Sequence, residues 1–295
     1  MERVLVSGVS GPIGAALLPY LESQGARIVR LVRGPARGSD QISWDPLRPL
    51  AAAVSGFEAV IHLAGETIAG RWTEAKKKAI LESRVQGTRH LAEPLAQTQS
   101  PPRVFICASA IGFYGNRGDE VLTEASPAGK GFLPEVTREW EAASQIATDA
   151  GIRTVNLRLG LVLSPKGGAL KKILTPFKLG LGGKIGSGQQ WWSWIHVDDI
   201  VGALHHALQT DSLSGPVNLV APNPARNLDF TQVLASVLRR YAFFHVPAFA
   251  ARLAFGEMAD ELLLSSERVE PTKLRDSGYA FRFAELRLAL EDLLG

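Results

Sequence analysis

Three glycines near the start of the chain restrict its fold more than any other feature. They lie in the turn GVSGPIG at positions 8–14, directly after an apolar run at 3–7. Gly8 allows a tight turn out of a strand, Gly11 lets the backbone approach a bound phosphate, and Gly14 lets a helix pack closely on the strand. Pro12 suits the first turn of a helix, where its missing N–H is not needed. The amides at such a helix start attract an anion, so the turn predicts a site for a dinucleotide pyrophosphate.

Apolar runs alternate with helical periodicity over the first two thirds of the chain. This alternation predicts βαβ units and a parallel sheet that helices cover on both faces. The expected strands are 3–7, 27–32, 59–63, 103–107, 154–158 and 216–220. The expected helices are 13–24, 74–96, 133–150, 196–208 and 229–241.

The regular alternation ends after position 158. Residues 160–195 hold eight glycines, which favours loops with unusual backbone angles. We therefore expect an α/β fold, a Rossmann-type doubly wound parallel sheet with a smaller C-terminal α+β substrate lobe. The expected nucleotide-binding domain is 1–160, to which 193–222 return, and the expected smaller lobe is 161–192 together with 223–295.

Composition excludes several classes of protein. With 46% hydrophobic and 21% charged residues, the chain has the balance of a globular protein. Its formal net charge is only +3 and no long basic run occurs, so we expect no nucleic-acid partner. Neither a membrane-length apolar stretch nor a secretory signal is present, which predicts a cytoplasmic protein without a membrane partner. Cys107 is the single cysteine, and the paired His205 and His206 lack matching ligands nearby, so no metal site is expected.

The end of the second expected strand indicates which dinucleotide is bound. Proteins that bind NAD usually place an Asp or Glu about twenty residues after the glycines, where it bonds the adenosine ribose. Here the segment 31–37 reads LVRGPAR and holds no carboxylate. Arg33 can form charge-assisted hydrogen bonds to a 2′-phosphate, although arginine at this position is also common on solvated surfaces. The sequence therefore predicts NADP(H).

Motifs along the whole chain resemble those of the extended and atypical short-chain dehydrogenase/reductases. More narrowly, the chain is similar to the NADP-binding group called epimerase family proteins, which includes a human atypical reductase and carries a characteristic C-terminal domain. The segments that carry this resemblance are 8–14, HLAG at 62–65, Ser109 with YG at 114–115, RLGLVL at 158–163, PFKLGLGG at 176–183, WIHVDD at 194–199 and the tail 256–281.

The resemblance implies a set of cofactor contacts around the glycine turn and two neighbouring strand ends. The carboxyl ends of parallel strands beside a topological switch point are where ligands lie, and the small Ala64 and Gly65 leave room there for a ribose. Arg84 is included, with a salt bridge on a helix surface as the alternative. The expected contacts are Gly8, Ser10, Gly11, Pro12, Ile13, Gly14, Val32, Arg33, Leu63, Ala64, Gly65, Arg84 and Leu161.

The catalytic pair of this family does not carry over. Active short-chain reductases use Tyr-x-x-x-Lys with a Ser, because the lysine lowers the tyrosine pKa for proton transfer. The matching positions here are Leu133 and Thr137, and none of the four tyrosines precedes a lysine at that spacing. Ser109, just after the strand 103–107, and Tyr114 are the candidate substitutes, and a packing role is the alternative for Tyr114. Glu66 and Glu141 are further candidate proton carriers, with structural roles as the alternative.

A glycine- and tryptophan-rich segment at 182–194 is the expected substrate side. Flat indole faces can stack on a ring, and polar neighbours can bind its substituents, although the tryptophans can equally pack the two lobes together. The candidates are Lys184, Gln190, Trp191 and Trp192.

Two functions follow from these patterns. The first is an NADP(H)-dependent oxidoreductase or nucleotide-sugar epimerase with a non-standard active site, acting on an unidentified small molecule. The second is a catalytically inactive NADP(H)-binding redox sensor or scaffold. The long helices 74–96 and 133–150 offer a pairing surface, and their charged faces make a monomer equally compatible with the sequence, so both a monomer and a homodimer stay open.

Overall fold

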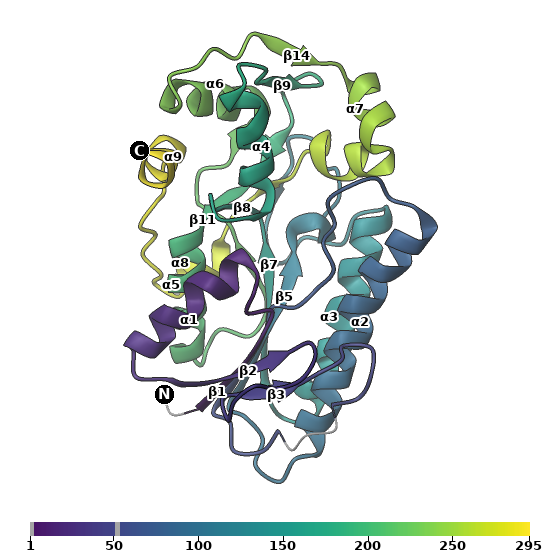
Figure 1. Ribbon diagram of the computed structural model, residues 1–295, viewed down its shortest axis with the longest axis vertical. Helices are drawn as coiled ribbons and strands as arrows, with labels where there is room; N and C mark the ends of the chain where they lie inside the picture. The colour runs from purple at the N-terminus through teal and green to yellow at the C-terminus, as the bar shows by residue number, and fades with distance from the viewer. Residues whose placement is uncertain (1–2, 51–53) are drawn as a thin grey trace.

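A seven-stranded parallel sheet forms the centre of the molecule, in a computed structural model that describes residues 3–50 and 54–295. Its strand order is β12-β7-β5-β4-β1-β2-β3, and every neighbouring pair runs parallel (Figure 1). The order reverses between β1 and β4, which makes this the topological switch point of a doubly wound sheet. The predicted Rossmann-type fold is confirmed.

The central sheet consists of β1 (Arg3–Ser7), β2 (Arg27–Val32), β3 (Gln41–Ser43), β4 (Ala59–His62), β5 (Val104–Ala110), β7 (Arg153–Leu159) and β12 (Gly215–Leu219). The other strands form two-stranded pairs: β10 (Trp191–Trp192) with β13 (Ala225–Arg226), β11 (Trp194–His196) with β8 (Leu161–Leu163), β14 (Phe244–Val246) with β9 (Gly183–Ile185), and β15 (Arg268–Val269) with β6 (Val121–Leu122).

The helices are α1 (Pro12–Ser23), α2 (Glu74–Gln97), α3 (Phe132–Asp149), α4 (Gly168–Lys178), α5 (Val197–Gln209), α6 (Asn227–Val237), α7 (Ala248–Phe255), α8 (Thr272–Asp276) and α9 (Leu286–Leu294). Two short irregular turns complete them, η1 (Ile111–Phe113) and the π-helical η2 (Ala259–Leu263).

Helices cover both faces of the sheet, as its uniformly apolar strands require (Figure 1). On one face α1 and α5 bury Leu17 and Leu204 against the sheet. On the other face α2 and α3 bury Leu91 and Trp140 against the opposite sides of the same strands. The two cores hold the sheet between them and leave its carboxyl edge for the connecting loops.

A second lobe lies above the carboxyl edge of the sheet (Figure 1). Its core gathers α4, α6 and α9 around the fully buried Phe230 and Trp194. The chain leaves the sheet after β7, builds α4 and β9, and later returns to add β12 at the sheet edge. The chain thus returns to the sheet within the predicted segment 193–222, while the exact limits of the two domains stay a prediction.

Four segments differ from the predictions. The strand β5 continues to Ala110, so Ser109 lies within the strand and not after it. The short edge strand β3 was not predicted, since its three residues carry too little pattern. The helix α4 was not predicted, and it forms because Leu170, Leu174 and Phe177 lie on one face and enter the lobe core. The expected loop at 179–188 contains the short strand β9, which pairs with β14.

His196 and the acidic pair after it are structural. His196 is the N-cap of α5, where its Nδ1 accepts the amide of Asp198 at 3.0 Å. The Asp199 carboxylate accepts the amides of Arg282 and Phe283 at 2.8 and 2.9 Å. These bonds anchor the C-terminal segment to α5, so the family motif at 194–199 fixes one lobe on the other.

Candidate functional site

The glycine turn leaves no space for side chains at its two ends. Gly8 has φ +73°, and a Cβ there would lie 2.5 Å from the backbone carbon of Leu63. A Cβ on Gly14 would lie 2.6 Å from the carbonyl oxygen of Gly8. Both contacts are with backbone, which cannot move aside. Strand β1, the neighbouring strand end and α1 therefore meet more closely than any other residue type allows.

Gly11 differs from these two glycines because its side-chain direction is open. Its φ of −75° suits any residue, and an added Cβ would meet only the Gly8 carbonyl oxygen at 3.4 Å. Gly11 is the N-cap of α1, no side chain caps this helix, and Pro12 occupies its first turn. The arrangement fits an anionic group bound against the helix start, the position predicted for a pyrophosphate.

The predicted contact residues of this turn reach the surface together. Gly8, Ser10, Gly11, Pro12 and Ile13 are half-buried or exposed, whereas Gly14 is buried beneath them. They lie at the end of β1, beside the end of β4, on the switch-point edge of the sheet. These predicted contact residues therefore lie together on one accessible turn.

The end of β4 supplies the next part of this edge. The amide of Leu63 donates to Ser7 at the end of β1, which holds the two strand ends in register. Ala64 is half-buried and Gly65 exposed, and a Cβ on Gly65 would lie 3.4 Å from the guanidinium carbon of Arg84. Small residues thus keep this edge open.

Arg84 reaches this edge from α2. Its Nη1 donates to the carbonyl oxygens of Glu66 and Ile80 at 2.9 and 3.2 Å, and its guanidinium lies over the ring of Trp140. Burial lowers the pKa of Arg84 to about 10. No acidic side chain within the described part of the chain pairs with it, so the alternative of a surface salt bridge is wrong.

The end of β2 presents Val32 and Arg33. Val32 is half-buried and its carbonyl accepts the amide of Trp44, while Arg33 is exposed. Across residues 3–50 and 54–295, no carboxylate lies within ion-pair distance of Arg33. The guanidinium is exposed to an anion from outside the chain, and its charge also helps to lower the pKa of Glu66.

The second lobe also contacts the cofactor turn. The segment joining β8 to α4 passes over the start of α1, where a Cβ on Gly167 would lie 3.5 Å from Pro12. Leu161, at the start of β8, donates its amide to the carbonyl of Ser193 at 2.8 Å. Sequence reasoning missed the Gly167 contact, because the two segments are far apart in the chain.

Ser109 and Tyr114 belong to a buried hydrogen-bond network. Ser109 Oγ donates to Glu141 Oε1 at 2.7 Å, and the same carboxylate receives Arg158 through Nε and Nη2, both at 2.8 Å. Arg158 Nη1 donates to the Tyr114 hydroxyl at 2.9 Å, and that hydroxyl donates to Asn218 Oδ1 at 2.6 Å. The polar groups of both predicted catalytic residues are thus bound by other side chains of the chain.

The environment of Tyr114 opposes release of its proton. The side chain is fully buried, and loss of solvent raises the pKa of Tyr114 to about 12 against the opposing effect of Arg158. The Arg158 guanidinium also lies 3.5 Å from the centre of the Phe113 ring. The phenol is held in a protonated, structural state at neutral pH.

The family positions of the missing pair are apolar or satisfied locally. Leu133 and Thr137 on α3 are both buried. The Thr137 hydroxyl donates to the carbonyl of Leu133 at 2.7 Å, one turn back in its own helix. Leu133 packs 3.3 Å from the position of a Cβ on Gly112 in η1. Neither side chain can move a proton.

Glu66 and Glu141, the other predicted proton carriers, are both paired with basic side chains. Glu66 accepts Lys76 Nζ at 2.6 Å, and this hydrogen bond lowers the pKa of Glu66. Glu141 forms the bidentate pair with the buried Arg158. A carboxylate stabilised in its charged form is a poor proton donor near neutral pH.

Glu267 is a site residue that sequence reasoning missed. Its backbone carbonyl accepts Ser193 Oγ at 2.7 Å, and its amide donates to the carbonyl of Trp191 at 3.1 Å. The Ser193 carbonyl also accepts the amide of Leu161, so Ser193 links the backbone of Glu267 to a predicted cofactor contact. Burial first, and the charge of Glu261 second, raise the pKa of Glu267 to about 8. No local sequence signal distinguishes it, because the effect arises only in the folded chain.

The predicted substrate residues point to different surroundings. Gln190 is buried and donates to the carbonyls of Ile185 and Leu263, both at 3.0 Å. Trp191 lies between the guanidinium groups of Arg226 and Arg268 and donates to Asp119, and Trp192 packs edge-on against Phe230. Lys184 lies within β9 and is half-buried. None of the four lines either of the two pockets described next.

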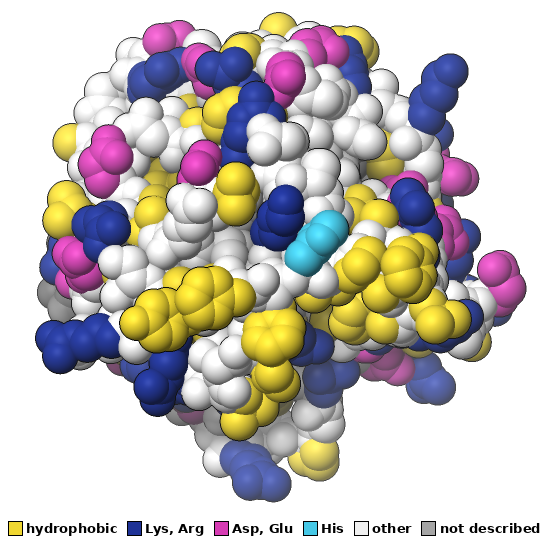
Figure 2. Space-filling model, turned by 90° about the horizontal axis from the view of Figure 1, so that it is seen from above, with side chains coloured by type: hydrophobic (Ala, Val, Ile, Leu, Met, Phe, Trp, Pro, Cys, Tyr) yellow, Lys and Arg dark blue, Asp and Glu magenta, His cyan; other side chains and the backbone are white. Residues whose placement is uncertain are grey.

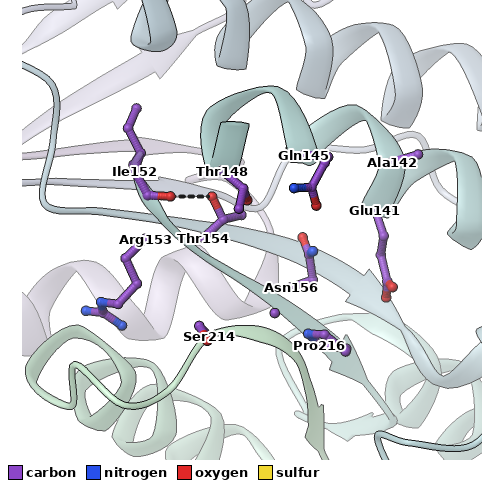
Figure 3. A pocket seen from close by; sticks show the side chains of 11 residues that line it. Glu141, Ala142, Gln145, Thr148, Ile152, Arg153, Thr154, Asn156, Ser214 and Pro216 are labelled. Atoms are coloured by element: carbon purple, nitrogen blue, oxygen red, sulfur yellow. Dashed lines mark hydrogen bonds between the residues drawn. The ribbon is translucent and has the colours of Figure 1, made fainter. Parts of the chain in front are cut away.

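The larger pocket, about 690 Å³, lies away from the glycine turn. Figure 3 shows α3 and the strands β7 and β12 around it, where Glu141, Gln145 and Asn156 supply polar groups. Asn156 there accepts Ser144 Oγ at 2.8 Å. This pocket lies where α3 does not cover the edge of the sheet formed by β7 and β12.

A smaller pocket of about 260 Å³ lies between the two lobes. It is lined by η1 with the segment after it and by η2 with its flanks, including Glu261 and Ser265. The Glu261 carboxylate accepts the first amides of α3, those of Phe132 and Leu133, at 3.3 and 3.1 Å. Glu261 and Ser265 also interact with the Glu267 carboxyl, whose pKa is raised. This carboxyl therefore lies next to the smaller pocket.

Residues 3–50 and 54–295 contain neither a cluster of metal ligands nor a helix that could span a membrane. No group of three or more His, Cys, Asp or Glu side chains is placed to hold a metal ion. No helix in this part of the chain has both the length and the apolar character needed to cross a bilayer.

Comparisons with known proteins agree with this geometry. Residues 4–220 match the NAD dependent epimerase/dehydratase family, and residues 246–293 match a domain of unknown function, DUF1731. The chain is 38% identical to the epimerase family protein Mb2239 of Mycobacterium bovis over 292 residues, 97% of this chain and 96% of that protein.

Two solved structures are similar along nearly the whole chain. A crystal structure of the human epimerase family protein SDR39U1 (isoform 2) with NADPH has a TM-score of 0.92 at 36% identity, covering 99% of each chain. The nucleoside-diphosphate sugar epimerase of Corynebacterium glutamicum has a TM-score of 0.84 at 37% identity, covering 99% of this chain and 58% of that one. From its glycine turn to its C-terminal lobe, the chain therefore belongs to the NAD dependent epimerase/dehydratase family.

Proposed function

We propose that the chain binds NADP(H) on the glycine turn and acts as an oxidoreductase of the epimerase type, with Glu267 as its proton carrier. The observation that carries the proposal is the glycine turn, with its open Gly11 and the uncapped start of α1. Glu267 supports it, because its backbone is hydrogen-bonded to Ser193 beside Leu161 and burial raises the pKa of its carboxyl. The human relative crystallised with NADPH and the bacterial nucleoside-diphosphate sugar epimerase support the choice of cofactor and substrate class. The substrate we propose is a small molecule whose alcohol carbon is oxidised to a carbonyl, or the reverse.

The residues present fit NADP(H) by their geometry. The open side of Gly11 and the uncapped start of α1 would receive the pyrophosphate, and the exposed Arg33 would receive the 2′-phosphate. Gly65 and Arg84 would border the ribose at the end of β4. When bound, the nicotinamide supplies hydride transfer.

The proton is the chain's own contribution to this chemistry. A carboxyl that titrates near pH 8 can both give and take a proton at neutral pH, which is what an alcohol–carbonyl interconversion requires. The hydrogen bond from Lys76 lowers the pKa of Glu66, the Glu141 carboxylate is occupied by Arg158 and Ser109, and Tyr114 is buried in the core. Glu267 differs from these three residues because its pKa is raised toward neutrality and its backbone is hydrogen-bonded to Ser193.

The second candidate function is an NADP(H)-binding sensor or scaffold without turnover. The buried Leu133 and Thr137 at the family's catalytic positions favour it. The two functions differ in one measurement, NADPH oxidation or NADP reduction across a panel of carbonyl compounds, alcohols and nucleotide sugars. Turnover that Glu267→Gln removes supports the oxidoreductase, and silence across the panel with intact NADPH binding supports the sensor.

Arg33→Ala is expected to weaken NADPH binding about tenfold or more while leaving NADH affinity unchanged. The reason is the loss of charge-assisted hydrogen bonds to the 2′-phosphate, which NADH lacks. Fluorescence titration of both cofactors measures the effect. The matched control is Arg37→Ala, which removes another exposed arginine from the same loop. Equal weakening of both cofactors would contradict the assigned role of Arg33.

Glu267→Gln is expected to stabilise the protein in alkaline solution. The unfolded chain releases this proton near the ordinary value of 4.5, and the folded chain releases it near 8. Between these values the folded state holds more protons, so wild-type stability falls as pH rises, by up to about 1.4 kcal/mol per pH unit. The glutamine variant lacks this loss, so its advantage is absent below pH 4.5 and full above pH 8.

Thermal or denaturant unfolding at pH 5, 7 and 9 tests this expectation without any substrate. Glu257→Gln, which removes an exposed carboxylate paired with Lys77, is the control. An unchanged pH dependence in Glu267→Gln would refute the raised pKa, and it would leave NADP(H) binding to be judged by the titrations with Arg33→Ala.

A further inference from the structure

The end of the C-terminal lobe farthest from the sheet exposes large apolar side chains. Phe243 is 82% exposed, Tyr241 77%, Leu253 76%, Phe249 72% and Leu179 70%. Figure 2 looks onto this end and shows the apolar side chains gathered in neighbouring groups with basic side chains between and around them. We call this surface the apolar end, formed by Leu179, Leu181, Tyr241, Phe243, Phe244, Phe249 and Leu253.

The elements that carry the apolar end are packed side by side. Strand β14 pairs with β9, so that Phe244 lies opposite Gly183. Leu179 and Leu181 come directly before β9, while Tyr241 and Phe243 stack on each other directly before β14. Helix α7 follows β14 and carries Phe249 and Leu253 (Figure 1). The exposed side chains therefore form one continuous end of the molecule.

The segments that form this end are basic, with Asp229 and Glu257 directly outside the two limits of one of them in the sequence. The segments 150–197 and 230–256, which include all of it, contain no Asp or Glu. Within the described part of the chain, seven basic side chains on these segments have no carboxylate within ion-pair distance: Lys166, Lys171, Lys172, Lys178, Lys184, Arg239 and Arg240. Arg252 differs, since it pairs with Asp260 at 2.9 Å.

Arg239 is held at this end in an unfavourable backbone conformation. It has φ 52°, the left-handed region that follows a helix and usually holds glycine. A cation thus occupies a position where glycine would cause less strain.

Unpaired cations and projecting aromatic side chains together limit what can cover the apolar end. A two-fold contact with a second copy would bring two sets of cations face to face, which is repulsive. None of the seven side chains of the apolar end lines either described pocket, although Arg252 of α7 lines the smaller one. Separate apolar side chains that stand out from a basic surface are instead the pattern of proteins that lie on a bilayer.

We propose that the apolar end docks on the surface of an anionic phospholipid membrane. Phe243, Phe249 and Leu253 would enter the boundary between headgroups and acyl chains, and the surrounding lysines and arginines would face the lipid phosphates. The sequence prediction of no membrane partner rests on the lack of a spanning segment, and it does not address a protein that rests on the surface.

Co-sedimentation with vesicles of phosphatidylcholine containing phosphatidylglycerol tests the proposal on the full chain. We expect binding at low salt, at least about tenfold weaker binding to pure phosphatidylcholine, and loss of binding as salt screens the charges. The double variant Phe243→Ser with Phe249→Ser removes two projecting rings, and Lys178→Glu with Arg240→Glu reverses two charges. Each is expected to reduce binding at least about tenfold.

Matched controls make the same changes elsewhere on the molecule. Leu47→Ser with Leu288→Ser removes two apolar side chains that are each 57% exposed. Arg27→Glu with Arg89→Glu reverses two exposed cations away from this end. Unfolding curves check that each variant is folded, since the altered side chains lie outside the core. The proposal fails if anionic vesicles do not bind the wild type, if the control variants lose binding equally, or if sedimentation finds a dimer that the Phe243→Ser with Phe249→Ser variant dissociates.

Discussion

The Gly11→Ala variant is expected to keep its fold and to bind NADPH at least about a hundredfold more weakly than the wild type. Its backbone angle suits alanine, and the added methyl group would meet only one carbonyl oxygen at 3.4 Å. The same methyl group would stand where a pyrophosphate must approach the start of α1. A change that the free protein tolerates therefore blocks the ligand.

Gly14→Ala provides the contrasting result at the same turn. Its methyl group would lie 2.6 Å from the Gly8 carbonyl oxygen and 2.7 Å from the Val9 Cα, so the strand and α1 would have to move apart. We expect this variant to lose stability as well as cofactor. Gly87→Ala, in the interior of α2 and 3.4 Å from Pro46, is the control that should keep both.

Titration with NADPH and unfolding in the absence of cofactor separate these three variants. Unchanged NADPH affinity in Gly11→Ala would mean that the pyrophosphate does not lie on this turn. A loss of stability in Gly11→Ala equal to that in Gly14→Ala would mean that the two glycines have the same structural role, which the contact distances exclude.

The cofactor side of the molecule could be predicted because its constraints are local. A strand, a glycine turn and a helix follow one another within about twenty residues, and β1 and β2 have the predicted limits 3–7 and 27–32. Buried parallel strands appear in the sequence as unbroken apolar runs, and this is why the sheet was recognisable. The helix α4 was missed because Gly167, Gly168 and Pro176 obscure its apolar spacing.

The proton-transfer side could not be predicted because its properties come from distant contacts. Tyr114 is bound by Arg158 and Asn218, which lie 44 and 104 positions further along the chain. Only this network shows that the tyrosine is structural. Glu267 similarly lies in a Ser-Ser-Glu sequence that carries no motif. Its pKa is raised by burial and by the charge of Glu261, and both arise only in the folded chain. Charge and solvent exposure at such positions are properties of the tertiary fold.

Removing Arg158 is expected to cause the largest loss of stability of any single change considered. Its side chain is 3% exposed and the paired Glu141 side chain 13% exposed, so both charges are largely shielded from water. Arg158→Met keeps the bulk but leaves Glu141 without its partner and Tyr114 without one of its hydrogen bonds. Breaking such a buried pair costs about 3–5 kcal/mol, whereas replacing both partners by neutral groups costs much less.

The double variant Arg158→Met with Glu141→Gln is therefore expected to recover part of the lost stability, because no buried charge remains unpaired. The exposed pair Lys78–Glu82, 3.8 Å apart, is the matched control, and Glu82→Ala should change stability by less than about 1 kcal/mol. Denaturant unfolding of the wild type, Arg158→Met, Glu141→Gln and the double variant measures the coupling. If the double variant were less stable than Arg158→Met, Glu141 would be satisfied by Ser109 and solvent without the arginine. The network would then orient Ser109 at the sheet edge and would not serve to neutralise charge. Ser109 would in that case again be a candidate catalytic residue.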